Sequence, residues 1–212
     1  LNVGGTFLVT GTSTIPTISG IVNFLNGLTI TGNATTTGNQ NITGNLTVTG
    51  AIKAPKGATL TVCASNAYRT TGCDYVADGI ADNVEIQAAI DALANKGGII
   101  YFSEGNFSIS ATMTLNNTHR GIHFIGSTAD SVNGTRLTLQ GGTNADMFVL
   151  DSSGGSLHFV FFSNMTLVGN KAGNTAGSGI VGTGSNTHDI FIDKVYVTGF
   201  KDAGIETDDI WG

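Results

Sequence analysis

The chain has 212 residues, enough for one sizeable domain or for a domain with an extension. Glycine is abundant at 31 residues, proline is scarce at 2, and charged residues make up only 11%, which favours β structure with tight turns over long helices. The net charge of −6, without a Lys/Arg cluster, argues against nucleic-acid binding, and the apolar runs are too short to span a bilayer. We therefore predict no nucleic-acid partner and no membrane insertion.

The first 52 residues contain no Asp, Glu, Lys, Arg or His. From Thr31 onward a six-residue unit repeats, in which Thr-Gly-Asn follows a mostly β-branched residue such as Ile30 or Ile42. Each unit has too little apolar area to offset backbone ordering, which costs about 1–2 kcal/mol per residue. We therefore predict that residues 1–52 form a β stalk completed by other copies of the chain, as a homotrimer. The alternative is a flexible Thr/Asn/Gly-rich linker.

Two pentapeptides in this region, LTITG at residues 28–32 and LTVTG at 46–50, resemble the neutral repeats of phage tail fibres and related viral appendages. The resemblance implies an extracellular location on a virion tail, with the stalk joined to other tail or virion proteins. Such repeats also occur in bacterial surface proteins, so a cell-surface adhesin or filament subunit stays an alternative.

Residues 53–80 read as a connector that contains both cysteines of the chain, Cys63 and Cys73. A disulfide between them would close a small loop and would fit an extracellular protein. Sequence separation says nothing about their geometry, so two free thiols remain equally open.

Residues 82–96 have the pattern of an amphipathic helix. Asp82 followed by Glu85 is typical of a capping box, in which the two side chains bond each other's backbone amides. The apolar positions Ile86, Ala89, Ile90 and Leu93 recur at helical spacing, and Gly97-Gly98 supply a stop.

This helix lies within a longer segment that resembles the N-terminal part of pectate-lyase-like right-handed β-helix proteins. The matching features are the Asp78-Gly79-x-x-Asp82 turn, the IQAAI helix at 86–90, Gly97-Gly98, the strand at 99–102 and the G-x-F-x-I strand at 105–109. The resemblance implies a right-handed parallel β-helix whose first turn is covered by the helix. One departure is Glu104, where the family often has proline.

Residues 81–212 are thus expected to be the N-terminal part of an all-β solenoid that continues beyond Gly212. Short apolar runs alternate with Gly, Asn, Ser and Asp turns, and a β-sandwich is the runner-up. The expected strands after residue 109 are 113–115, 122–125, 136–139, 147–150, 157–162, 165–168, 180–181, 190–192, 195–197 and 204–205.

Candidate chemistry gathers at the C-terminal end. Strand alternation would place Glu206 and Asp208 on one face, with Asp209 adjacent, and a carboxylate pair is what glycosidases use to cleave a sugar bond. Turn acids on a solvated edge are the alternative. The four histidines are scattered at residues 119, 123, 158 and 188, and no Gly-x-Ser-x-Gly motif supports a nucleophile. We predict no metal and no cofactor.

The function that these features favour is a structural and receptor-binding part of a viral tail fibre or tailspike that attaches to host surface polysaccharide. A polysaccharide depolymerase, either hydrolase or lyase, on the same β-helix is the alternative.

Overall fold

The computed structural model describes residues 58–130, 132–207 and 210–211, all within the second of the two units into which the chain divides, Gly50–Gly212. The stalk predicted at residues 1–52, with its trimer, lies outside the described residues. So do Asp208 and Asp209 of the predicted carboxylate site.

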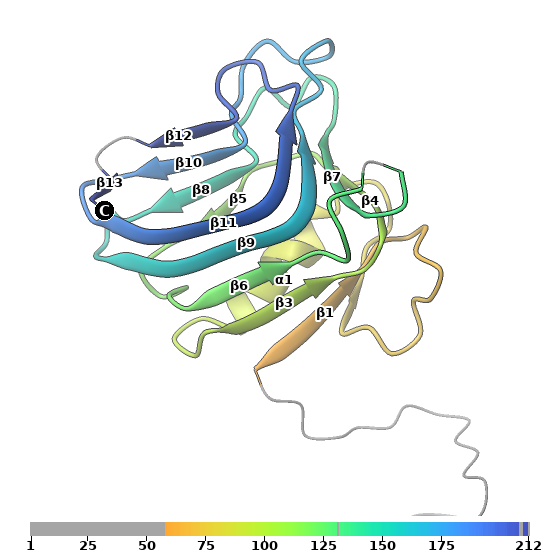
Figure 1. Cartoon of the computed structure of the whole chain (residues 1–212), viewed down its shortest axis with the longest axis horizontal. Helices are drawn as coiled ribbons and strands as arrows, with labels where there is room; N and C mark the ends of the chain where they lie inside the picture. Colours follow the sequence, from red (N-terminus) through yellow and green to blue (C-terminus); the bar gives the residue numbers. More distant parts are fainter. Residues whose placement is uncertain (1–57, 131, 208–209, 212) are drawn as a thin grey trace, which may run out of the picture. The chain divides into compact units, whose positions relative to one another are not determined.

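The described unit consists mostly of parallel strands in two sheets that curl around a common core (Figure 1). The nine-stranded sheet runs in the order β13, β11, β9, β6, β3, β1 and β2, while β4 pairs with β7 and β7 also pairs with β9. Its strands are β1 (Thr59–Cys63), β2 (Tyr75–Val76), β3 (Gly98–Phe102), β4 (Gly105–Ile109), β6 (Ile122–Ile125), β7 (Thr135–Leu139), β9 (Leu157–Val168), β11 (Thr187–Thr198) and β13 (Ile210–Trp211). The four-stranded sheet contains β5 (Met113–Leu115), β8 (Phe148–Asp151), β10 (Ile180–Thr183) and β12 (Ile205–Thr207).

Every strand pair in these sheets is parallel, so successive turns of the chain lie on one another as in a β-solenoid. The β-sandwich alternative, which requires antiparallel sheets, is therefore wrong for this unit. The expected strands are present, and four of them merge in pairs into the long strands β9 and β11. Residues 59–63, within the expected connector, instead pair with β3 as β1.

The long strands β9 and β11 bend twice at matching positions. The pairing skips Phe159 (φ 56°) opposite Asp189 (φ 54°), and further along it skips Asn164 (φ 56°) opposite Lys194 (φ 52°). Positive φ breaks the extended path of a strand, at a steric cost that is smallest for Asn among these residues. Because the bends are in register, the two strands remain paired while they curve around the core (Figure 1).

The core is filled by aliphatic side chains and a group of fully buried phenylalanines. Phe102, Phe124 and Phe162 lie on successive strands β3, β6 and β9, and their rings stack with centroids 6.2 and 4.9 Å apart. Phe148 from the other sheet meets Phe162 edge-on at 5.1 Å. The phenylalanines therefore connect the two sheets through one continuous apolar interior.

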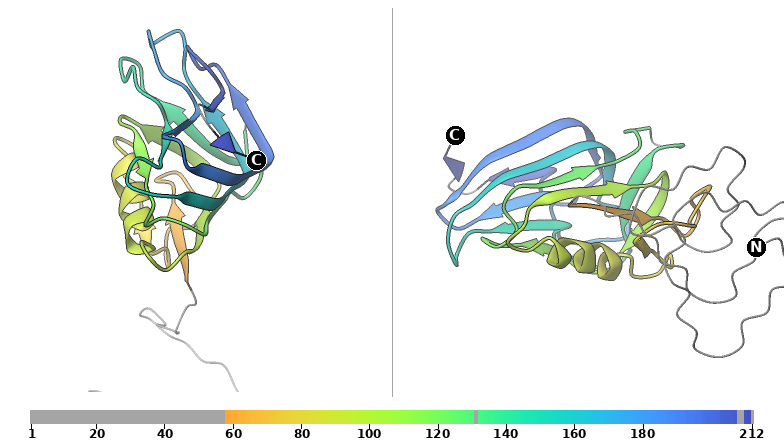
Figure 2. Two further views of the ribbon diagram at one scale, coloured as in Figure 1. Left: turned by 90° about the vertical axis from the view of Figure 1, so that its left-hand side faces the viewer. Right: turned by 90° about the horizontal axis from the view of Figure 1, so that it is seen from below.

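The described residues contain one α-helix, α1 (Asn83–Ala92), which lies beside β1, β2, β4 and β5 (Figure 2). Its buried residues are Ile86, Ala89 and Ile90, as the apolar spacing predicts. The helix is too short to cross a membrane.

The predicted capping box is wrong. Asp82 does occupy the N-cap, but its backbone is already helical (φ −64°, ψ −12°) and its side chain makes no capping bond. Its carboxylate instead accepts the N–H of Gly79 at 2.6 Å and the N–H of Ser108 at 2.7 Å, so it attaches the helix to β4. Glu85 Oε2 is buried without a hydrogen-bond partner among the described residues.

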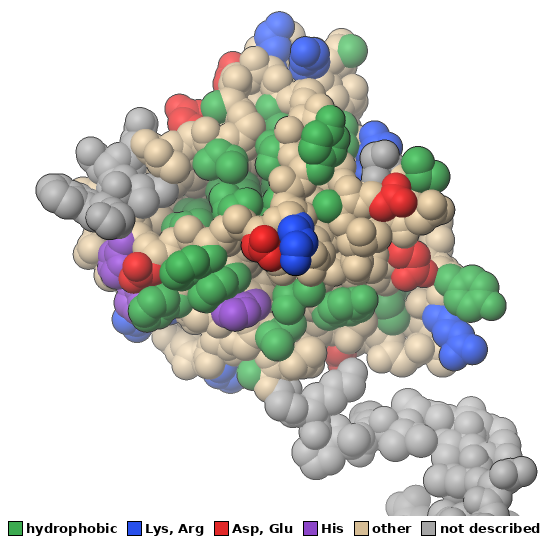
Figure 3. Space-filling view, viewed as in Figure 1, with side chains coloured by type: hydrophobic (Ala, Val, Ile, Leu, Met, Phe, Trp, Pro, Cys, Tyr) green, Lys and Arg blue, Asp and Glu red, His purple; other side chains and the backbone are tan. Residues whose placement is uncertain are grey.

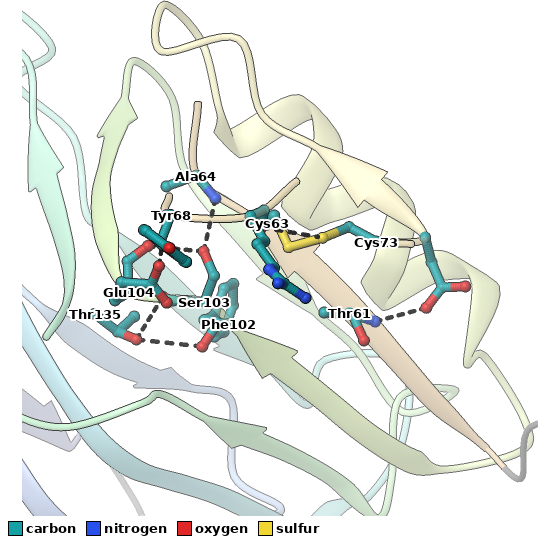
Figure 4. Close-up of a disulfide and its surroundings, with 11 residues drawn as sticks. Thr61, Cys63, Ala64, Tyr68, Cys73, Phe102, Ser103, Glu104 and Thr135 are labelled. Carbon is teal, nitrogen blue, oxygen red and sulfur yellow. Dashed lines mark hydrogen bonds between the residues drawn. A yellow bond between two sulfur atoms is a disulfide. The ribbon is translucent and has the colours of Figure 1, made fainter. Parts of the chain in front are cut away.

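A disulfide joins Cys63 at the end of β1 to Cys73, with Cα atoms 6.0 Å apart (Figure 4). The loop between the cysteines is also bonded to the turn after β3. Ser103 Oγ accepts the N–H of Ala64 at 2.9 Å, and Glu104 Oε1 accepts the N–H of Tyr68 at 2.6 Å. Glu104, the departure from the family pattern, therefore holds this loop through a bond that proline could not make.

Candidate functional site

Glu206, the described member of the predicted carboxylate site, is an exposed residue of β12. Its Oε2 accepts a hydrogen bond from Ser178 Oγ at 2.9 Å, and Ser178 Oγ in turn accepts the N–H of Ala203 at 3.1 Å. These bonds hold the carboxylate against the segment that leads into β10. Its catalytic pairing with Asp208 and Asp209 stays a prediction, since both lie outside the described residues.

Glu206 also lines a cavity of about 150 Å³ near the last described turn. The cavity walls are otherwise mostly apolar: Leu150, Ile180, Gly182, Ile190, Ile192, Ile205 and Thr207. Among the described residues that line the cavity, Glu206 is the one acid or base, whereas glycoside cleavage requires two. Among the residues that the structure describes, no group of three or more His, Cys, Asp or Glu side chains could hold a metal ion.

The outer face of the large sheet carries a row of apolar and aromatic side chains across four adjacent strands. Ile99, His123, Phe161 and Phe191 occupy one register line on β3, β6, β9 and β11. The His123 and Phe161 ring centroids are 3.8 Å apart, and Phe161 and Phe191 stack at 4.4 Å with planes 10° apart. Four strands span about 14 Å at ordinary spacing. We call these four residues the aromatic row.

The aromatic row is partly open to solvent and weakly charged. Phe191 is 45% exposed, while Ile99, His123 and Phe161 are half-buried. Burial lowers the pKa of His123, which keeps its imidazole neutral beside the Phe161 ring. Figure 3 shows the result on the face made by β11, β9, β6 and β3: a band of hydrophobic side chains with imidazoles in and beside it.

A second group of side chains lies on the same face, where β9 and β11 begin. Ser156 Oγ is 3.0 Å from His158 Nδ1 and 3.0 Å from His188 Nε2. His188 Nδ1 is 2.9 Å from Asp189 Oδ2, and the two imidazoles stack with centroids 5.0 Å apart. All four residues are half-buried or exposed, so solvent molecules can reach the group. We call it the serine–histidine cluster.

The bend in β11 makes this cluster possible. Neighbouring residues in a regular strand point to opposite faces, so His188 and Asp189 would ordinarily be kept apart. The positive φ of Asp189 breaks that alternation and brings its carboxylate to the imidazole. Phe159, at the matching position of β9, has the same conformation, which is uncommon for a bulky residue and concentrates at functional sites.

Sequence reasoning missed both groups because it treated the histidines as scattered. A signal was present, since one turn of the chain between β9 and β11 is 30 residues long. His158 and His188 are separated by this interval, as are Phe161 and Phe191. His119 and His123 do not join the cluster: His119 is buried near α1, where its Nδ1 accepts the N–H of Asn116 at 3.0 Å.

No protein-family model and no curated protein matches the sequence. Two solved structures are similar to parts of the chain. The A-module of the mannuronan C-5 epimerase AlgE4 from Azotobacter vinelandii is 23% identical, with 56% of this chain and 34% of that one covered and a TM-score of 0.45. ORF18 of Geobacillus virus E2 is 25% identical, with 53% of this chain and 23% of that one covered and a TM-score of 0.39. The chain thus spans about a third or less of each.

Proposed function

We propose that this chain is a structural and glycan-binding part of a viral tail fibre or tailspike. In this proposal the solenoid is a right-handed β-helix whose first turn is covered by α1, and it meets polysaccharide on the host surface. Residues 1–52 supply the stalk, which is completed by two further copies of the chain and joined to other virion proteins.

The observation that carries the proposal is the aromatic row. Exposed apolar side chains that form one continuous band on a protein surface mark a binding surface. Phe161 and Phe191 cover part of each other's faces, so the row presents ring edges and the remaining open ring surface as an apolar band. The C–H faces of pyranose sugars are flat and apolar and can pack against such a band. The row extends over about 14 Å, so it suits a short oligosaccharide segment better than a single sugar.

The polar groups beside the row fit a neutral or weakly charged sugar ligand. Tyr101 and Asp193 lie on the next register line and carry hydroxyl and carboxylate groups that can bond sugar hydroxyls. Lys194 Nζ lies 3.6 Å from Asp193 Oδ2 and balances its charge. The charge-free stalk adds support from the sequence, because a free-standing secreted enzyme has no need of one.

The test is binding of the full-length protein to purified surface polysaccharides of candidate hosts, measured by calorimetry. Phe161→Ser and Phe191→Ser should each weaken binding at least about tenfold, because each removes a stacked ring from the contact surface. Tyr196→Ser is the matched control, since Tyr196 is 54% exposed on the same strand β11 but lies outside the row. Equal affinity of all four proteins for a bound glycan would sink the proposal.

The depolymerase alternative rests on Glu206 with Asp208 and Asp209. Incubation of the protein with the glycan that it binds, followed by assay for new reducing ends and for unsaturated sugars, distinguishes the two functions. A pure attachment protein releases neither product. An enzyme of this kind would release one of them and lose the release in Glu206→Gln.

A further inference from the structure

The geometry points to a second activity on this face: hydrolysis of O-acyl esters, with Ser156 as the nucleophile and His188 as the general base. The three contacts that define the site are the two Ser156–imidazole distances of 3.0 Å and the His188–Asp189 distance of 2.9 Å. A nucleophile, a base within hydrogen-bond reach and a carboxylate that orients the base are the features that identify a site for acyl transfer.

The hydrogen-bonding inventory of the serine–histidine cluster permits one arrangement of protons when both imidazoles are neutral. An ionised Asp189 can only accept, so Nδ1 of His188 must carry the hydrogen and Nε2 must be a bare lone pair. Ser156 therefore donates its one hydroxyl proton to that Nε2. The Ser156 oxygen is then free to accept the N–H of His158 Nδ1.

This arrangement prepares Ser156 for attack on an ester carbonyl. As the Oγ–C bond forms, the hydroxyl proton passes to His188 Nε2 and the carbonyl π electrons move onto the carbonyl oxygen. When the tetrahedral centre collapses, the bond to the alkoxy oxygen breaks and His188 returns the proton to the leaving alcohol. Water then repeats the sequence on the acyl-serine, so the products are one carboxylic acid and one alcohol.

The surroundings favour a small acyl group on a larger carrier. Ser156 follows the Gly154-Gly155 turn, which Asn117 holds by donating its side-chain N–H to the Gly154 carbonyl at 3.0 Å, and Gly154 is exposed. Phe159, 50% exposed, meets the His158 ring edge-on at 4.9 Å and forms an apolar wall beside the cluster. The aromatic row begins three residues further along each strand. That the carrier is a sugar, and the natural substrate an O-acetylated glycan, rests on the proposed function.

The experiment uses the full-length protein with 4-nitrophenyl acetate and, separately, with diisopropyl fluorophosphate followed by peptide mass analysis. We expect hydrolysis that falls about 100-fold or more in Ser156→Ala and in His188→Gln, and covalent labelling at Ser156. Asp189→Asn should lower kcat at least about tenfold without changing KM, because Asp189 is a positioning residue that acts through His188. Ser185→Ala, at an exposed serine in the loop before β11, is the matched control and should retain full activity.

The inference is overturned if Ser156→Ala, shown to be folded by its thermal transition, hydrolyses the ester as fast as the unaltered protein, or if the label lies elsewhere. Hydrolysis by other surface imidazoles would persist in Ser156→Ala, so the rate of that variant measures this background. The small ester needs no glycan contact, so its hydrolysis tests this site alone. A second assay measures acetate release from an O-acetylated polysaccharide. If Phe161→Ser loses this release but still hydrolyses nitrophenyl acetate, the aromatic row is the surface that binds the glycan carrier.

Discussion

The imidazole of His188 lies parallel to that of His158 one turn earlier in the chain, with the ring planes 15° apart and a shared hydrogen-bond partner in Ser156. The stack sets the planes of the two rings, and the hydrogen bonds to Ser156 and Asp189 set which ring edge faces which partner. His158 thus has a defined role in the proposed site, as a donor to the oxygen that attacks.

That role predicts the effect of His158→Phe, which preserves a stacked ring and removes the Nδ1 donor. Ester hydrolysis should fall roughly tenfold, the equivalent of one hydrogen bond of about 1.4 kcal/mol. The thermal transition should remain near that of the unaltered protein, because packing is retained. Steady-state kinetics and a melting curve together check this, and unchanged kinetics would remove His158 from the mechanism.

The disulfide should stabilise the described unit by reducing the conformational entropy of the unfolded chain. Cys63 and Cys73 are ten residues apart, and closure of a loop of that size contributes about 2–3 kcal/mol in the chain-entropy description. Denaturation of the Cys63→Ser, Cys73→Ser double variant in urea should show a loss of this size. An equal stability of the oxidised protein and the double variant would mean that the bonds of Ser103 and Glu104 suffice to hold the loop.

Asp82 and Glu85 should respond oppositely to substitution, because only Asp82 makes the bonds described above. Asp82→Ala leaves two backbone N–H groups without their charged acceptor, and each such bond contributes about 1.5–3 kcal/mol. Glu85→Gln should leave the free energy of unfolding unchanged or raise it, since the buried Oε2 has no partner to lose. Parallel urea titrations give the comparison, and a larger loss at Glu85 would restore the capping-box interpretation.

The described unit should lose stability in mild acid because the folded state resists protonation of His119. Burial lowers the pKa of its imidazole from 6.5, although the nearby Asp91 carboxylate pulls in the opposite direction; Asp91 is largely exposed, so water screens its effect. The folded state therefore resists a proton that the unfolded chain takes up. Stability is fully present above about pH 6.5 and declines as the pH falls through the lower, folded-state pKa.

The measurement is the thermal transition between about pH 7.5 and about pH 5.5. His119→Gln keeps an oxygen that can accept the N–H of Asn116 and removes the titrating ring. Its transition should decline less with pH than that of the unaltered protein. An identical decline in both would assign the acid sensitivity to other groups, among them His123, whose pKa burial also lowers.

Phe124 occupies the middle of the interior stack, so its truncation should be costly. Phe124→Ala removes contacts with Phe102, Phe148 and Phe162 and leaves a cavity, for which about 3–5 kcal/mol is the usual loss. Phe191→Ala, on the outer face, should change the unfolding free energy by less than about 1 kcal/mol. An equal loss of unfolding free energy in the two variants would contradict the placement of Phe124 in the core and of Phe191 on the outer face.

Much of the architecture could be predicted because local pattern and fold agree. The helix at α1 and most strands follow from apolar spacing, and β5 and β6 have the expected bounds. The helix is shorter than the predicted 82–96, because it ends at Ala92 and not at the Gly97-Gly98 stop. The strand β1 was missed because its neighbours are polar and the cysteines suggested a connector. The capping box failed because a tertiary contact with Ser108 competes for the Asp82 carboxylate.

The candidate site could not be predicted, for a different reason. Ser156 and His188 are 32 residues apart, and only the register between β9 and β11 brings them together. Asp189 depends further on a positive φ at a residue that could equally have continued the strand. Glu206, by contrast, is one of several neighbouring acids in the sequence, and in the structure it accepts a hydrogen bond from Ser178.

The matching bends of β9 and β11 have a consequence for how such a protein can change. Residues 157–186 make one complete turn of the chain, because Leu157 pairs in register with Thr187. A duplicated copy of this segment could therefore be inserted between β9 and β11 and pair with both strands in the same register. Each insertion would add one more ring to the aromatic row and one more layer of buried side chains to the core. Reach along a ligand would therefore grow in whole steps of about 4.8 Å, without redesign of the layers already present.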